Sequence, residues 1–220
     1  MFNDRAEAGR LLAQRCAELA LVRPVVLALP RGGVAVAAEI ARALAAPLDV
    51  VLVRKIGAPD QPELAVGAVA DGSEPEIAVN AKLVHVLGLD QDYIAREAGR
   101  ELAVIERRRR QYEGLRPAVE IAERAAIVVD DGVATGMTMW AALRHVRRRK
   151  PARLVAAAPV ASRQALARLE PEADTVLCLS SPRRFGSVGS FYRSFTQVSD
   201  EEVAALLTAA NGGKEGGGRA

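Results

Sequence analysis

The 220-residue sequence predicts an α/β fold in which helices flank a parallel sheet. First, short β-branched strands alternate with amphipathic helical segments, and parallel strands need such crossovers. Second, two strands run directly into loops of small residues followed by a helix, a common design of ligand sites in α/β folds. Third, 50% of the residues are hydrophobic, enough for a large core. We expect one domain over residues 1–210 and a disordered, glycine-rich tail over 211–220.

The first part of the chain supplies a helix, a strand, a helix and a second strand. Periodicity predicts these over residues 4–20, 25–29, 34–44 and 48–53. Residues 57–80 change character, because proline and glycine punctuate two short apolar runs, 64–69 and 77–79. This composition favours a flexible hairpin rather than core.

The second part repeats the alternation of strands and helices. A long charged helix is predicted over residues 90–115. Strands are then expected at 127–129, 154–158 and 175–179, and helices at 139–146, 162–169 and 201–207. The cations of residues 147–150 fit the negative C-terminal end of a helix, which is a common structural use.

Bulk properties narrow the class of protein. No apolar run reaches the length of a membrane span and the N-terminus has no signal-peptide core, so we expect a cytoplasmic protein. Cys16 and Cys178 lie in apolar contexts and are expected to be reduced core residues. His85 and His145 alone give almost no support to a histidine zinc site. A net charge of +3 is compatible with anionic small molecules or nucleic acid and decides neither.

The most informative stretch is residues 127–139, where a buried strand ends in two acids. Asp130 and Asp131 would lie at the carboxyl edge of the sheet, where carboxylates suit a vicinal diol. The backbone amides of residues 133–138 can converge on an anion at the N-terminus of the next helix, with hydroxyl groups from Thr135 and Thr138. Together these features describe a ribose 5-phosphate site. The alternative is an acidic strand end, capped by threonine, before an ordinary helix.

A second loop of this kind follows the strand at 25–29. Gly32 and Gly33 would let backbone amides approach a ligand, and Arg31 adds a permanent cation whose fork matches phosphate oxygens. The alternative is an ordinary turn with a solvent-exposed arginine.

The acidic stretch resembles the phosphoribosyl pyrophosphate (PRPP) signature of type I phosphoribosyltransferases, and the resemblance covers most of residues 25–180 in order. It implies that fold, with a five-stranded sheet in the order 3-2-1-4-5. It also implies a pyrophosphate loop at residues 31–33, often with a cis peptide at Pro30-Arg31 or Arg31-Gly32. The PRPP-binding residues implied here are Arg31, Gly32, Gly33, Asp130, Asp131, Gly132, Val133, Ala134, Thr135, Gly136, Met137 and Thr138.

The resemblance extends to three further segments. Arg54 and Lys55 are similar to a basic pair that contacts PRPP in adenine-type enzymes, although such a pair is often only a solvated strand end. The loop at about 56–80 matches a mobile catalytic flap; the alternative is a simple surface excursion. Residues about 183–198, called the hood below, would cover the acceptor. Its candidate acceptor contacts are Phe185, Phe191 and Tyr192, unless a small satellite core forms around Phe191 and Phe195.

The implied activity is a Mg²⁺-dependent pentosyl transfer, in the glycosyltransferase class, in which ribose 5-phosphate moves from PRPP to a nitrogenous acceptor and pyrophosphate leaves. The catalytic candidates are Arg31, Lys55, Asp130 and Asp131. A nucleobase nitrogen is the expected acceptor, which would place the enzyme in nucleotide metabolism. No side chain is assigned as a metal ligand, because Mg²⁺ would bridge substrate oxygens and keep several waters. Family resemblance also implies a homodimer.

Two other functions stay open at this point. A regulator could bind PRPP or nucleotides on the same fold and contact RNA or DNA through Arg107 to Arg110. Acidic neighbours at Glu97, Glu101, Glu106 and Glu113 favour a solvated or subunit-contact role for that cluster instead. Alternatively, an enzyme could use the same ribose-phosphate site for hydrolysis.

Overall fold

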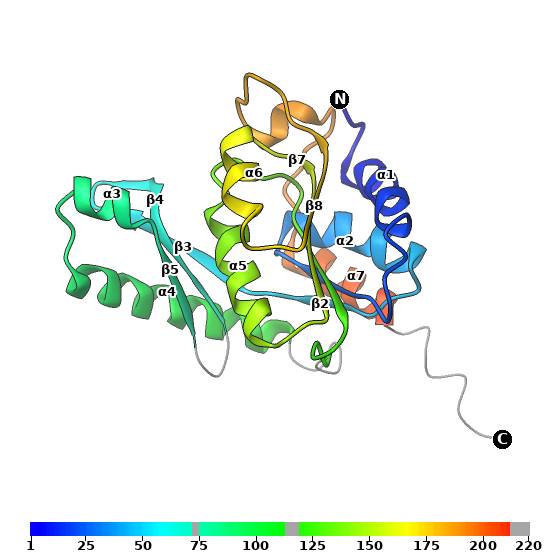
Figure 1. Ribbon diagram of the computed structural model, residues 1–220, viewed down its shortest axis with the longest axis horizontal. Coiled ribbons are helices and arrows are strands. Elements are labelled where there is room, and N and C mark those ends of the chain that lie inside the picture. The colour runs from blue at the N-terminus through cyan, green and yellow to red at the C-terminus, as the bar shows by residue number, and fades with distance from the viewer. Residues whose placement is uncertain (72–74, 113–118, 212–220) are drawn as a thin grey trace.

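A computed structural model describes residues 1–71, 75–112 and 119–211, and its centre is a five-stranded parallel sheet (Figure 1). The strands lie in the order β2-β1-β6-β7-β8. Their bounds are Val25–Ala28 for β1, Leu48–Val50 for β2, Ala125–Val129 for β6, Arg153–Val160 for β7 and Thr175–Ser180 for β8. The α/β fold expected from the sequence is confirmed, and all five carboxyl ends lie at one edge of the sheet.

Numbered along the chain, the five parallel strands follow the order 2-1-3-4-5, so the expected order 3-2-1-4-5 was wrong. The segment between the second and third of them forms a separate antiparallel sheet of β3 (Val53–Ala58), β4 (Gln61–Ala70) and β5 (Glu76–Val79). Only two residues join β3 to β4, and so short a connection allows antiparallel pairing but no parallel crossover. Strands β4 and β5 pair antiparallel, so the hairpin expected here is present. Its mobility stays a prediction.

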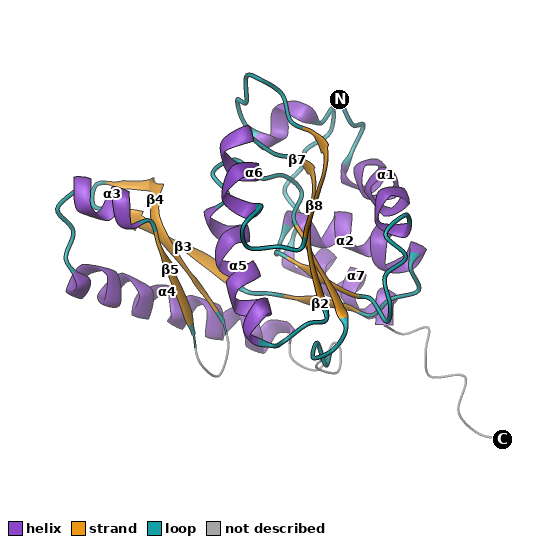
Figure 2. Cartoon of the chain, viewed as in Figure 1, coloured by secondary structure: helices purple, strands orange, loops and turns teal. Residues whose placement is uncertain are grey.

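Helices cover both faces of the central sheet (Figures 1 and 2). One face packs against α1 (Arg5–Ala17), α2 (Gly32–Ala43) and α7 (Asp200–Asn211), and the other against α5 (Met137–Arg148) and α6 (Arg163–Leu169). Alternate strand residues serve the two faces, because side chains in a strand point in opposite directions. Ile127 and Val129 join the first core, and Val128 joins the second.

The small antiparallel sheet has its own core, contrary to the expectation that this segment lies outside any core. Ile56 and Val66 are buried against Ile94 and Ala98 of α4 (Gln91–Tyr112). A short helix that was not predicted, α3 (Ala81–Val86), leads into α4. The other face of the small sheet reaches α5 through Ala68, Ala78 and Ala141, whose small side chains let strand and helix approach closely.

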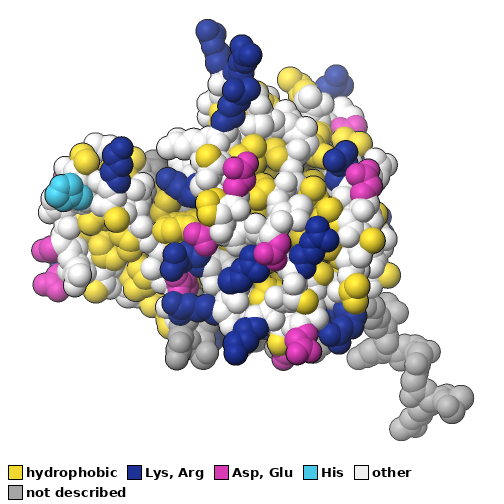
Figure 3. Space-filling view, viewed as in Figure 1, with side chains coloured by type: hydrophobic (Ala, Val, Ile, Leu, Met, Phe, Trp, Pro, Cys, Tyr) yellow, Lys and Arg dark blue, Asp and Glu magenta, His cyan; other side chains and the backbone are white. Residues whose placement is uncertain are grey.

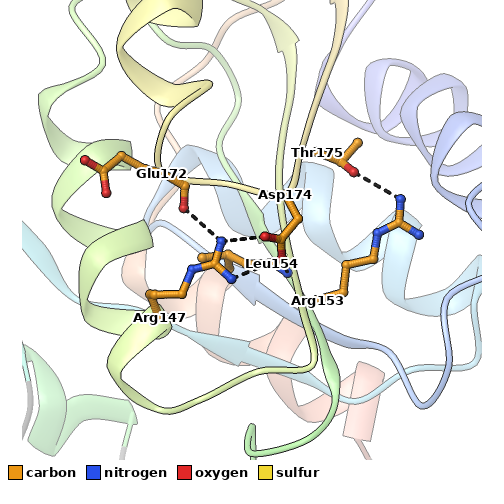
Figure 4. Close-up of polar contacts among 6 residues, drawn as sticks. All are labelled: Arg147, Arg153, Leu154, Glu172, Asp174 and Thr175. Atoms are coloured by element: carbon orange, nitrogen blue, oxygen red, sulfur yellow. Dashed lines mark hydrogen bonds and ion pairs between the residues drawn. The ribbon is translucent and has the colours of Figure 1, made fainter.

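Arg147, in the basic C-terminal end of α5, holds the helix to the segment that precedes β8 (Figure 4). The favourable effect of the cations of residues 147–150 on the negative end of the helix, expected from the sequence, stays a prediction. Arg147 donates to both carboxylate oxygens of Asp174, at 2.9 and 3.1 Å, and to the carbonyl oxygen of Glu172. Asp174 also accepts from the amide of Leu154 at 2.7 Å. The Arg147 hydrogen bonds lower the pKa of Asp174. This cluster ties α5 to the amino ends of β7 and β8, at the sheet edge opposite the carboxyl ends.

Charged side chains of both signs intermix over the face shown in Figure 3. Within the Arg107 to Arg110 cluster, Arg109 Nε donates to Asp71 at 2.9 Å and Arg110 Nε lies 3.6 Å from Glu106. These ion pairs favour the interpretation that the arginines are paired with acids of the same chain at the surface. Nucleic-acid binding by the cluster remains an untested prediction.

The remaining expectations concern the cysteines, the tail and the membrane. Cys16 is fully buried, and burial raises its pKa to about 12, whereas Cys178 is only partly buried. Asn211 belongs to α7 rather than to the tail, and its side-chain amide donates to Leu48 at 3.0 Å. The rest of the predicted tail lies outside the described residues, as do residues 113–115 of the predicted long helix. In the described ranges, no helix is long and apolar enough to span a membrane.

Candidate active site

The candidate site lies at the carboxyl edge of the central sheet, between β1 and β6. The chain passes from β1 to β2 in one direction and continues through β6, β7 and β8 in the other, which makes this crevice a topological switch point. Open α/β sheets bind their ligands at such points. The β1–α2 loop and the β6–α5 loop meet here, and the amide of Leu29 donates to the carbonyl oxygen of Val129 at 2.9 Å.

The two acids that follow β6 are held close together and largely out of solvent. The Asp131 amide donates to Asp130 Oδ1 at 2.8 Å. Burial raises the pKa of Asp130, and the negative charge of Asp131 raises it further. Burial also raises the pKa of Asp131, against the opposing effect of a nearby arginine, Arg5. Poorly solvated carboxylates of this kind gain most from hydroxyl donors or a cation, so the pair is suited to a ligand diol.

The glycine pair of the β1–α2 loop approaches the acidic motif so closely that a side chain would not fit. A Cβ atom at Gly32 would lie 1.9 Å from Asp131 Oδ2, and one at Gly33 would lie 2.7 Å from the Val129 carbonyl oxygen. The peptide bond between Pro30 and Arg31 is cis, as the family resemblance implied. The Arg31 guanidinium is directed toward α7, with Nη1 3.9 Å from Asp200 Oδ2.

The loop from β6 to α5 presents a row of unused amides. None of the amides of residues 134–138 donates a hydrogen bond to another described residue. Gly136 adopts a φ of +80° immediately before α5, which a glycine allows without strain. Val133 differs from its neighbours, because its side chain is buried and its amide donates to Val160 at 2.9 Å. Val133 therefore anchors the loop, and the available donors begin at Ala134.

The backbone of this loop is fixed by α6. Ser162 Oγ donates to the carbonyl oxygen of Ala134 at 2.5 Å, and Arg168 donates to that of Thr135. Because both carbonyl groups are occupied by α6, the loop has a defined path into α5. A row of free amides at a helix N-terminus, beside Thr135 and Thr138, can bind an anion such as phosphate.

Arg54 and Lys55 lie on β3 and line a pocket of about 300 Å³ together with Tyr93, Glu97 and other residues of the small sheet and α4. Arg54 Nε lies 2.6 Å from Glu101 Oε2, so its guanidinium is directed at α4. The role of Arg54 and Lys55 in binding a substrate stays a prediction.

The hood lies directly on the acidic motif. A Cβ at Gly132 would lie 2.3 Å from Val188 Cγ1, so Val188 packs against that glycine. Tyr192 is 6% exposed between the rings of Phe2 and Phe195, and its hydroxyl donates to the Asp131 carbonyl oxygen at 2.5 Å. Tyr192 therefore packs in an aromatic cluster with Phe2 and Phe195, whereas the satellite core expected from the sequence was centred on Phe191 and Phe195.

Phe185 and Phe191 pair with each other instead, with ring centroids 5.2 Å apart. Their contact with an acceptor remains a prediction.

One residue of the site escaped the sequence analysis. Arg5, in the first turn of α1, places Nε 2.7 Å from Asp131 Oδ2, with its side chain only 11% exposed. A cation at a helix N-terminus opposes the helix dipole, and this mismatch is the one signal that could have drawn attention to it.

Fold and site define an α/β protein with a carboxylate pair and a row of unused amides at a topological switch point. The model of the phosphoribosyl transferase domain family matches residues 3–192. The chain therefore belongs to the phosphoribosyl transferase domain family, and the resemblance seen in the sequence is confirmed.

Relatives agree with this assignment. Two Mycobacterium tuberculosis proteins, each named "Putative phosphoribosyl transferase", are 43% identical over 211 residues, covering 96% of this chain and 47% of theirs. The chain thus spans about half the length of these curated relatives. The crystal structure of TT1426 from Thermus thermophilus is 47% identical with a TM-score of 0.83, covering 96% of this chain and 99% of that one. A Neisseria gonorrhoeae hypothetical protein with bound ppGpp shares the fold at 13% identity, with a TM-score of 0.50 and coverage of 96% and 99%.

Proposed function

We propose that the chain is a phosphoribosyltransferase that moves ribose 5-phosphate from PRPP to a nitrogenous acceptor and releases pyrophosphate. The observation that carries the proposal is the junction of β6 and α5, where a poorly solvated carboxylate pair precedes a row of unused amides. The diol and the 5-phosphate of one ribose 5-phosphate need these two features a few residues apart.

In this proposal each loop binds one part of PRPP. Asp130 and Asp131 accept hydrogen bonds from the ribose hydroxyl groups, and the amides of residues 134–138 donate to the 5-phosphate. The glycine loop and Arg31 bind the pyrophosphate. To do so, the Arg31 guanidinium must leave its weak contact with Asp200 and turn to the phosphate oxygens.

The reaction exchanges one bond at ribose C1 for another. The C1–O bond to pyrophosphate breaks with its electron pair on oxygen, and the acceptor nitrogen supplies the pair for the new C1–N bond and then loses a proton. Positive charge develops on the sugar ring, so the site acts by holding the sugar, neutralising the leaving group and aligning the acceptor.

The residues at the site fit Mg²⁺ held mainly by the substrate. Within the described ranges, no group of three or more His, Cys, Asp or Glu residues could form a metal cage. Mg²⁺ commonly retains waters and binds substrate phosphates, and Asp130 and Asp131 supply negative charge nearby. When bound, the ion would neutralise charge on the leaving pyrophosphate.

The proposed acceptor is a nucleobase. Hypoxanthine-guanine-type enzymes carry an aspartate at the position of Ala134, whereas adenine-type members tolerate alanine there, so Ala134 argues against the first class of purine.

Mass spectrometry of products formed from Mg-PRPP with a panel of nucleobases tests this proposal. We expect pyrophosphate and a new nucleotide only when one acceptor is present. Ribose 5-phosphate released without an acceptor would instead show a hydrolase. PRPP binding without turnover would favour the regulatory alternative.

A double variant, Asp130→Asn with Asp131→Asn, tests the site itself. It should lose most Mg-PRPP affinity, whereas Asp92→Asn on the exposed surface of α4 should not. A folded double variant with unchanged affinity would refute the assignment of the diol site. Arg31→Ala should lower the affinity for PRPP more than the affinity for ribose 5-phosphate, because only PRPP carries the pyrophosphate. Equal losses of affinity for the two ligands would contradict the role of Arg31.

A further inference from the structure

Arg5 brings together three segments that are far apart in sequence. Its Nε lies 2.7 Å from Asp131 Oδ2, and its Nη1 donates to the Thr196 carbonyl oxygen at 2.7 Å. The guanidinium carbon stands 3.8 Å from the centre of the Phe195 ring. One largely buried cation therefore contacts Asp131 of the acidic motif and two residues of the hood.

The backbone around Arg5 is fixed as firmly as its side chain. Asp4 caps α1 by accepting from the Glu7 amide at 2.8 Å. Phe2 exchanges hydrogen bonds of 2.8 Å with Phe191 and Arg193, and the Ser194 amide donates to the Asn3 carbonyl oxygen at 2.9 Å. The N-terminal residues and the hood thus form one paired unit, from which Arg5 extends to the acidic motif.

The position of Arg5 is unfavourable for the helix itself. A cation in the first turn of a helix is disfavoured by the helix dipole, whose positive end lies there. Asp131 offsets this cost, since a charge-assisted hydrogen bond between poorly solvated groups is strong. The arrangement makes physical sense if its main effect is on Asp131 rather than on α1.

Arg5 restricts the carboxylate of Asp131 to one orientation. With Oδ2 bound to Arg5 and the backbone carbonyl bound to Tyr192, rotation of the side chain would break a buried ion pair. Asp130 and Asp131 repel each other, and Arg5 is the cation that opposes the pKa rise of Asp131 caused by burial. A fixed, charged acceptor is what a sugar hydroxyl group requires.

We propose that Arg5 is a positioning residue for diol binding, which orients Asp131 and couples it to the hood. This inference rests on the proposed function, because it assumes that Asp131 accepts from the ribose hydroxyl groups. Arg5 need not touch the substrate, and its effect is transmitted through Asp131.

Calorimetric titration with two ligands separates this role from a general structural one. Ribose 5-phosphate carries the vicinal diol, whereas 2-deoxyribose 5-phosphate carries the same phosphate without it. Arg5→Ala should weaken the binding of ribose 5-phosphate by up to about a hundredfold, the loss that a misplacement of roughly 1 Å can cause, and should affect the binding of the deoxy ligand much less. Arg5→Lys should recover part of the affinity, since it keeps the charge but loses the fork.

The matched control is Arg10→Ala, which removes the same charge from the same helix. Arg10 is 59% exposed and its nearest acid, Glu39, is 3.8 Å away, so both ligands should bind as in the unchanged chain. In an Asp131→Asn background, Arg5→Ala should have little further effect, because coupled residues give non-additive losses. Circular dichroism verifies that each variant is folded.

Three results would overturn the inference while leaving the proposed function in place. These are equal losses for the two ligands, additive losses in the Asp131→Asn background, or tighter ribose 5-phosphate binding by Arg5→Ala, which would make Arg5 a competitor of the diol. Failure of the unchanged chain to bind PRPP or ribose 5-phosphate would instead refute the proposed function, and this inference with it.

Discussion

Gly32→Ala is the sharpest single perturbation of the site. The added Cβ would lie 1.9 Å from Asp131 Oδ2 and 2.6 Å from Asp131 Cγ, whereas real Cβ contacts are almost never shorter than 3.0 Å. The carboxylate or the glycine loop must therefore move by about 1 Å. Arg5 holds the same carboxylate oxygen, so this movement disrupts the Arg5–Asp131 ion pair.

The size of the effect follows from that displacement. Overpacking a close contact costs roughly 1–3 kcal/mol of unfolding free energy. Because Gly32 is partly exposed and its loop has room to shift, we expect a cost near the lower end of that range. A shift of about 1 Å in a group that holds the substrate can cost on the order of a hundredfold in binding or rate. We therefore expect a folded variant whose unfolding free energy falls by about 1 kcal/mol, while its affinity for ribose 5-phosphate falls on the order of a hundredfold.

Urea unfolding and calorimetric titration measure the two effects separately. Gly99→Ala is the matched control, because Gly99 lies on the exposed side of α4 and its Cβ would meet nothing within 4 Å. That change should raise the unfolding free energy by about 0.5–1 kcal/mol, the helical advantage of alanine over glycine, and leave binding unchanged. Unaltered ribose 5-phosphate affinity in Gly32→Ala would refute the assignment of Asp131 to the diol site.

Three other changes have defined outcomes. Glu76 is buried between half-exposed Arg144 and Arg148, so Glu76→Gln should lower the unfolding free energy by about 2 kcal/mol in urea titration, and an unchanged midpoint would contradict this. The pKa of Asp130 is raised by burial, so the folded chain holds this proton more tightly than the unfolded chain, and stability is lost as pH rises through the folded pKa. Asp130→Asn should therefore unfold at higher urea than the unchanged chain at pH 7, with the difference vanishing below about pH 4. Gly136→Ala, at a φ of +80°, should cost about 1–2 kcal/mol and weaken ribose 5-phosphate binding, with Gly99→Ala again as the reference.

Local sequence patterns were sufficient to predict the strands of the central sheet and the helices that cover it, but not the order of the strands. Strands such as 125–129 are buried on both faces and therefore read as continuous apolar runs, and the helices between them show a clear period. The small sheet was harder, because its strands contain glycine, proline and charged residues. Its core forms only when α4 packs on it, and that contact leaves no local signal.

The candidate site likewise has a part that could be predicted from the sequence and a part that could not. The acids, the glycine pair and the amide row lie within two short segments, so their spacing could be recognised directly. The contact between Arg5 and Asp131 joins residues 126 positions apart, and Tyr192 reaches Asp131 from 61 positions away. Such pairs depend on how the N-terminus and hood fold back on the sheet, which one sequence does not reveal. Likewise, the orientation of Arg54 toward Glu101 could not be foreseen from a basic pair at a strand end.

Helix α5 links the row of unused amides at the candidate site to the small antiparallel sheet. Its N-terminus carries the amides to which we assign the 5-phosphate of PRPP, and one side packs on the small sheet through Ala141. Arg148, eleven residues after Met137 and about 16–17 Å further along the axis, forms an ion pair with Glu76 of β5. A helix is stiff over this length, so a tilt of α5 on binding a phosphate would also move the end of the β4–β5 hairpin at which β5 begins. Binding of a phosphate at the N-terminus of α5 would thus affect the orientation of the β4–β5 hairpin, which contacts the C-terminal end of the helix.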